Sequence, residues 1–78
     1  MKWYTLEERP IKERETARYL MAGKDKDGDL WMDWIWMNVQ NNLVYENDVG
    51  DWKILDRKEI IGYIPLKELE ETLPKDKQ

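Results

Sequence analysis

The chain has 78 residues, a formal net charge of −4 and no cysteine, which leaves room for one domain and excludes disulfides and thiolate metal sites. Histidine, serine and phenylalanine are also absent, so the usual nucleophile–base pairs of enzymes are not available. No apolar run approaches the roughly 18 residues that cross a membrane, and the N-terminus becomes charged too early for a signal peptide. We therefore expect a cytoplasmic protein that is not an enzyme and does not contact a membrane.

The N-terminal part of the chain contains one short strand and one ambiguous segment. Residues 2–6 alternate as in a strand, and residues 7–15 form a charged connection that Pro10 keeps out of a sheet. The charged side chains up to Arg18 are expected to form a solvated surface. Residues 16–24 show both helical spacing and strand-like alternation of apolar side chains. We prefer a strand, because the glycine-containing connection that follows suits a hairpin, and a helix stays open.

Residues 30–39 are the most apolar segment and are expected to form the central strand. They read Leu-Trp-Met-Asp-Trp-Ile-Trp-Met-Asn-Val and contain three of the five tryptophans. As a strand, the segment would direct Trp34 and Trp36 to one face and Trp31 and Ile35 to the other. Both faces would then need cover, either from the chain or from a partner. A short apolar run also suits a helix, but turn residues on both sides favour the strand.

The second half of the chain predicts three further strands and one helix. The strands are expected at residues 43–46, 52–55 and 59–64. Pro65 suits the first position of a helix, and the leucines between residues 66 and 73 then form one apolar stripe. This helix is too short to be stable alone, so we expect it to pack on the sheet.

These elements together predict the α+β class. We expect a small antiparallel sheet of four to six strands, with the short C-terminal helix packed on it. Residues 1–74 would form a single domain, and residues 75–78 a frayed tail.

Four short motifs give the sequence a family resemblance. They are Trp3, Glu7-Glu8-Arg9-Pro10, Tyr19-Leu20-Met21 and Gly62-Tyr63-Ile64-Pro65-Leu66. In this order they resemble a short domain of unknown function that phages and prophages carry. That family usually has tryptophan where this chain has Tyr63, and the helix after Pro65 is a further departure. The resemblance implies a phage-encoded accessory protein with a small antiparallel sheet, and it implies no established activity.

The negative charge is concentrated in the middle of the chain. Residues 24–52 carry two basic and seven acidic side chains, whereas residues 53–78 carry six of each. A hairpin between the central strand and the next would bring the two acidic loops to one end of the sheet. Such an acidic pole would repel nucleic acid and attract a basic protein surface, although loops are commonly polar for no functional reason. Its candidate binding residues are Asp25, Asp27, Asp29, Asp48 and Asp51.

The segment from Asp25 to Asp29 is similar to the start of a calcium loop. In the helix–loop–helix form, that loop has glycine at its sixth position and glutamate at its twelfth. Counted from Asp25, these positions hold Leu30 and Trp36. We therefore expect a plain turn, with no metal and no cofactor.

Trp31, Trp34 and Trp36 are the aromatic candidates for binding. They could be core residues or a stacking platform, but the neighbouring acidic charge disfavours nucleic acid as the ligand. We expect at least one of the three to remain exposed. The preferred function is a non-enzymatic interaction protein that binds a protein partner of unknown identity. The alternatives are a small-ligand domain with a tryptophan-lined pocket and a self-associating homodimer.

Overall fold

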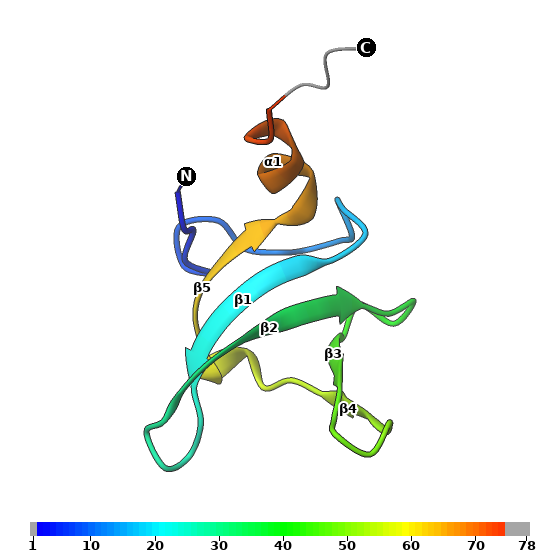
Figure 1. Cartoon of the computed structure of the whole chain (residues 1–78). Coiled ribbons are helices and arrows are strands. Elements are labelled where there is room, and N and C mark those ends of the chain that lie inside the picture. Colours follow the sequence, from blue (N-terminus) through cyan, green and yellow to red (C-terminus); the bar gives the residue numbers. More distant parts are fainter. Residues whose placement is uncertain (1, 75–78) are drawn as a thin grey trace.

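The computed structural model describes residues 2–74, which form a five-stranded antiparallel sheet followed by a short helix (Figure 1). The elements are β1 (Tyr19–Lys24), β2 (Leu30–Met37), β3 (Leu43–Glu46), β4 (Trp52–Ile54), the 3₁₀ helix η1 (Arg57–Glu59), β5 (Ile60–Pro65) and α1 (Leu66–Glu71). The strand order β4-β3-β2-β1-β5 places β2 in the middle. The expected class, strand count and central strand are confirmed, while residues 75–78 lie outside the described residues.

The ambiguous segment before the first hairpin is a strand, β1. It pairs with β2 on one side and β5 on the other. Its side chains alternate between the two faces of the sheet, as in a strand: Tyr19 and Met21 point to the same face and have no exposed surface. A helix would have buried Ala17, which is exposed in the structure.

Several element boundaries differ from the sequence prediction. Only Tyr4 of residues 2–6 pairs with the sheet, through two 2.9 Å backbone bonds to Tyr63, because a turn begins after Thr5. The strand β2 ends two residues early, which leaves Val39 in a loop and 98% exposed. Pro65 is the last residue of β5 and the N-cap of α1, rather than the first helical residue.

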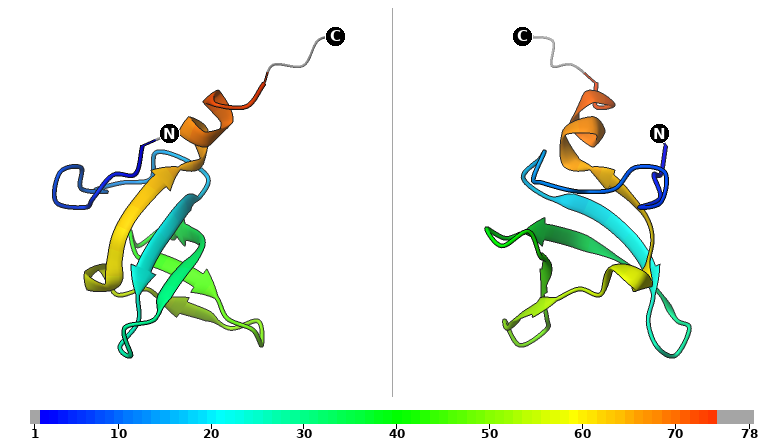
Figure 2. Two further views of the ribbon diagram at one scale, coloured as in Figure 1. Left: turned by 60° about the vertical axis from the view of Figure 1, so that its left-hand side comes forward. Right: turned by 180° about the vertical axis from the view of Figure 1, so that it is seen from behind.

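The sheet has an inner face, which carries the core, and an opposite outer face. β2 pairs with β1 along six residue pairs but with β3 along only two. As a result β3 and β4 turn away from β1 and β5, and the sheet curls around its inner face (Figures 1 and 2). The buried cluster on the inner face comprises Ile11, Tyr19, Met21, Ile35, Met37, Leu43, Leu55 and Tyr63.

The three hairpin loops share one five-residue conformation, at residues 25–29, 38–42 and 47–51. In each loop the side-chain oxygen of the first residue accepts hydrogen bonds from the backbone N–H groups of the third and fifth. The fourth residue has a positive φ, namely 82° at Gly28, 62° at Asn41 and 87° at Gly50. Asp and Asn at the first position and Gly or Asn at the fourth are the residues that this turn needs.

The helix α1 continues from β5 past the end of the sheet (Figure 1). None of its residues is fully buried: Leu66 and Leu69 are partly covered and Leu73 is exposed, so the expected leucine stripe is not packed into the core. Polar contacts hold its first turn instead. Leu66 N–H donates to the Arg18 carbonyl at 3.0 Å, and Lys67 N–H donates to Thr16 Oγ1 at 3.1 Å.

Candidate functional site

The strand β2 distributes the three candidate tryptophans over both faces of the sheet. Trp31 is on the inner face with Ile35, whereas Trp34 and Trp36 are on the outer face, because successive side chains of a strand point to opposite sides. Trp36 is 37% exposed and the other two are partly buried, which confirms the expectation that at least one tryptophan remains exposed. The three therefore belong to two different surfaces.

The outer face is apolar across β1, β2, β3 and β4. Cross-strand pairs place Leu20 opposite Trp34, and Val44 between Trp36 and Ile54. Directly opposed side chains of this kind lie in contact range, so the apolar groups form a continuous row. Its most exposed members, at 37–73% exposure, are Leu30, Met32, Trp36, Trp52 and Ile54.

An arginine side chain stacks on the tryptophans of this outer face. The guanidinium carbon of Arg18 lies 4.4 Å from the ring centroid of Trp34 and 5.6 Å from that of Trp36. Both distances are within the range of a cation–π contact. Arg18 was expected in a solvated charged surface, but its Nε is buried and has no hydrogen-bond partner among the described residues. Its side chain thus covers part of the two indoles and holds them in place.

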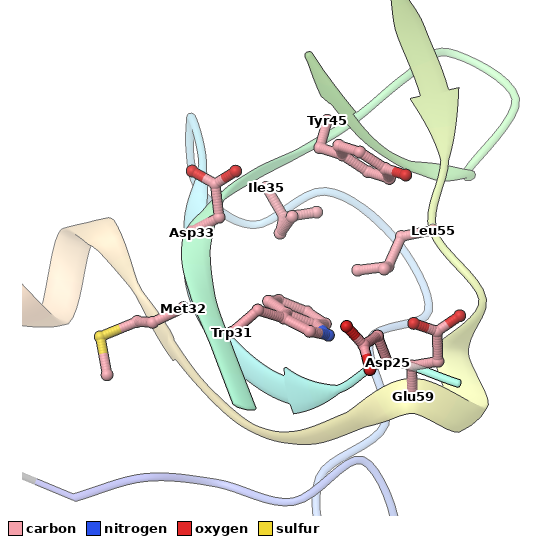
Figure 3. A pocket seen from close by; sticks show the side chains of 8 residues that line it. All are labelled: Asp25, Trp31, Met32, Asp33, Ile35, Tyr45, Leu55 and Glu59. Atoms are coloured by element: carbon pink, nitrogen blue, oxygen red, sulfur yellow. The ribbon is translucent and has the colours of Figure 1, made fainter. Parts of the chain in front are cut away.

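The inner face contains a pocket of about 250 Å³, which we call the inner pocket (Figure 3). Two aromatic side chains, Trp31 and Tyr45, and two aliphatic ones, Ile35 and Leu55, surround its apolar part. The residues come from β2, β3 and the segment after β4, so the curl of the sheet creates the pocket. The remaining lining residues are Met32, Asp25, Asp33 and Glu59.

The carboxylates around the inner pocket come from three separate segments. Figure 3 shows Asp25 and Glu59 at the end where the Trp31 indole lies, while Asp33 is farther along β2. Asp25 Oδ1 already accepts two backbone N–H groups within its loop, and Asp33 Oδ1 accepts the N–H of Trp34. Sequence reasoning did not identify Glu59 or Tyr45, because their approach to Trp31 depends on how β3 and the chain after it turn away from β2.

The loop carboxylates divide into two groups. Oxygen atoms of Asp25, Asp27 and Asp29 lie within 4.8 Å of one another, and all three residues are exposed. Hard cations prefer such oxygens, but the hydrogen bonds of the shared loop conformation already account for Asp25. Asp48 and Asp51 lie in the loop between β3 and β4 and do not join this cluster.

The acidic pole is therefore less compact than the sequence analysis expected. That expectation needed β3 to run back along β2, but their pairing ends after Trp36–Val44 and β3 then turns away. The loops at residues 25–29 and 47–51 do lie at the same end of the molecule, at separate corners (Figures 1 and 2).

A polar cluster joins the N-terminal segment to α1. Glu68 receives hydrogen bonds from the Tyr4 hydroxyl at 2.6 Å and from Arg9 Nη1 at 2.8 Å, while Arg9 Nη2 lies 3.2 Å from Glu15. The Arg9 guanidinium also lies 4.4 Å from the Tyr4 ring centroid. Sequence reasoning assigned Arg9 and Glu15 to a solvated surface, because the partner of Arg9 is 59 residues away in the chain.

The same cluster shifts several pKa values. The hydrogen bond from Tyr4, followed by that from Arg9, lowers the pKa of Glu68 below its usual 4.5. The hydrogen bond with Glu68 raises the pKa of Tyr4, and burial raises the pKa of Tyr63 to about 12. The Tyr63 hydroxyl donates to the Arg9 carbonyl at 2.6 Å, so it is held as a neutral donor. The cluster is an anchor between distant segments.

Comparisons with known proteins identified no relative of this chain. No protein-family model matches this sequence, and no curated protein or solved structure is significantly similar to it. Among residues 2–74, no helix has the length and apolar character needed to span a bilayer. The function must therefore be argued from the two surfaces of the sheet.

Proposed function

We propose that this chain is a non-enzymatic, phage- or prophage-encoded domain that binds a protein partner through its outer face. The observation that carries the proposal is the continuous row of apolar side chains on β2, β3 and β4, with Leu30, Met32 and Ile54 all more than 60% exposed. Tryptophan and methionine are enriched in interface cores, and exposed apolar patches mark interaction sites. The phage origin rests on the sequence resemblance alone.

The stacking of Arg18 supports this proposal, because it preorganises the outer face for binding. Arg18 stacks on Trp34 and Trp36 before any partner arrives, so less side-chain freedom is lost on binding. Buried aromatic and arginine side chains at the centre of an interface commonly contribute most of the binding energy. We therefore place the centre of the partner interface at Arg18, Trp34 and Trp36, with Met32 and Ile54 beside it.

The test compares a face variant with a loop variant of the same chemistry. Met32→Lys with Ile54→Lys changes the outer face, whereas Val39→Lys with Val49→Lys places the same charges at two exposed hairpin loops. All four side chains are at least 63% exposed, so we expect unfolding free energies within about 0.5 kcal/mol of the parent.

Host proteins captured by the parent chain are then purified and bound directly to each variant. The face variant should bind at least about tenfold more weakly, and the loop variant should bind like the parent. Equal affinities for the two variants would contradict the proposal.

The acidic loops provide a separate test of the partner's charge. Asp25, Asp27, Asp48 and Asp51 are exposed, and the two hairpin loops that contain them lie at the same end of the molecule (Figure 1). Their replacement by asparagine should slow association with a basic partner more than it speeds dissociation, and added salt should reduce the difference. An unchanged association rate at low salt would remove the loops from the interaction.

Self-association is the competing use of the outer face. Sedimentation of the parent chain at micromolar concentration should show a monomer. A dimer that dissociates in the Met32→Lys, Ile54→Lys variant would assign the face to a second copy of the chain instead.

A further inference from the structure

We infer that the inner pocket binds an organic cation, namely an alkylammonium or guanidinium group on a short aliphatic chain. The aromatic and aliphatic walls of this site lie on the opposite face of the sheet from the proposed protein interface. Met32 and Asp25 enter the tests of both sites, so the two sites are separated by Ile54→Lys, which is outside the pocket, and by Glu59→Gln, which is outside the outer face. Three observations on the lining residues carry the inference: the aromatic walls, the charge and the size.

The aromatic walls suit a cation. Trp31 and Tyr45 come from β2 and β3, and Figure 3 shows their rings on opposite sides of Ile35 and Leu55. A cation near the face of tryptophan or tyrosine is attracted by the ring's negative face. The aliphatic floor formed by Ile35 and Leu55 is suited to the methylene groups that carry such a cation.

The charge of the lining residues selects the sign of the ligand. Asp25, Asp33 and Glu59 are three carboxylates, and no lysine or arginine lines the pocket. Within residues 2–74, none of the three forms a salt bridge, since both salt bridges of that part involve Arg9. Lys53 pairs with Tyr45 across β3 and β4, but it is exposed and is not a lining residue. The pocket thus offers negative charge with no internal counter-ion.

The size limits the ligand to one side chain or one small amine. The volume of about 250 Å³ is below the roughly 300–1,000 Å³ that is common for pockets holding drug-sized ligands. A lysine or arginine side chain and a free amine share this chemistry. Because so few heavy atoms make contact, the dissociation constant of a free amine is expected to be on the order of millimolar.

The first experiment uses ligands that differ only in charge. n-Butylammonium and n-propylguanidinium are titrated into the isotopically labelled chain, with n-butanol and butyrate as the neutral and anionic controls. The indole N–H signal of Trp31 and the backbone signal of Tyr45 should shift with the two cations and remain in place with the controls. Equal shifts with n-butanol would overturn the inference, because the pocket would then be selecting apolar groups alone.

The second experiment uses matched charge variants. Asp25→Asn keeps the loop intact, because Asn38 and Asn47 make the same backbone hydrogen bonds in the other two loops. Glu59→Gln changes a side chain that makes no hydrogen bond among residues 2–74. Each should weaken cation binding about two- to fivefold, the range of a solvent-exposed ion pair. Asp27→Asn removes the same charge from the same loop outside the pocket and should have less than about half of that effect.

The source of the cation is decided by a third titration. Short neutral peptides that contain one lysine or one arginine are compared with the free amines. Tighter binding of a peptide assigns the pocket to a protein side chain, and equal binding assigns it to a free amine. If all the cations shift neither Trp31 nor Tyr45 at low salt, the inference is wrong, whatever the outer face binds.

Discussion

The indole of Trp31 lies against Gly23, its cross-strand partner in the pairing of β1 with β2. A Cβ atom added at Gly23 would lie 2.5 Å from Trp31 Cζ2 and would also meet the backbone oxygen of Glu59. The positions of Trp31 and Glu59, which both line the inner pocket, therefore depend on the absence of a side chain at Gly23. The glycine is required by the close approach of its neighbours.

Gly23→Ala should destabilise the protein and displace Trp31. Overpacking of this kind typically costs about 1–3 kcal/mol, to be measured by denaturant unfolding. Gly62→Ala is the matched control on β5, where the nearest atom would be the Tyr4 oxygen at 3.3 Å, and it should cost less. If Gly23→Ala is as well tolerated as Gly62→Ala, the contact does not control the position of Trp31.

The shared hairpin loop predicts a contrast between its fourth residues. Gly28→Ala should cost about 1–2 kcal/mol, because an L-residue must then adopt a left-handed conformation. Nothing lies within 4 Å of the added Cβ, so the cost is purely conformational. Asn41→Gly should change the unfolding free energy by less than about 0.5 kcal/mol, because asparagine already tolerates this conformation. A neutral Gly28→Ala variant would contradict the loop assignment.

Glu68 predicts a loss of stability in acid. Its folded-state pKa lies below the usual 4.5, so its contribution is present above the unfolded-state pKa and is lost as the pH falls through the folded-state pKa. Glu68→Gln should flatten the dependence of unfolding free energy on pH in this range. The matched control is Glu70→Gln, an exposed position on the same helix, which should keep the parent slope. Identical acid profiles of the parent and the Glu68→Gln variant would exclude this role.

Tyr63 predicts a loss of stability in base. Burial raises its pKa from 10.0 to about 12, so its contribution is fully present below pH 10 and is lost as the pH rises toward 12. Tyr63→Phe should reduce the alkaline slope. It should also cost about 1 kcal/mol near neutral pH, because the Arg9 carbonyl loses its donor. Tyrosinate absorbance during a pH titration checks both the order of ionisation and its coupling to unfolding.

Local chemistry was sufficient to predict most elements of the sheet. Residues 43–46 form a strand with the predicted limits, because the loops on both sides begin with asparagine and contain a residue suited to positive φ. The central place of residues 30–37 followed from their composition, because both faces of this strand are mainly apolar and both need cover. Turn residues and the apolar pattern of one strand each involve only a few neighbouring residues, so the sequence by itself was enough to predict these elements.

Long-range geometry decided the rest. The period of a strand already assigned Trp34 and Trp36 to one face and Trp31 to the other, but it did not predict which residues would surround Trp31. Only the bend of the sheet after Trp36–Val44 brings Tyr45, Leu55 and Glu59 to Trp31 and separates the two acidic loops. Likewise, the tertiary structure alone brings Arg9 to Glu68, which is 59 residues away in the chain and accepts its hydrogen bond. Spacing along the chain carries no information on such encounters, because they depend on how the strands curl around a common core.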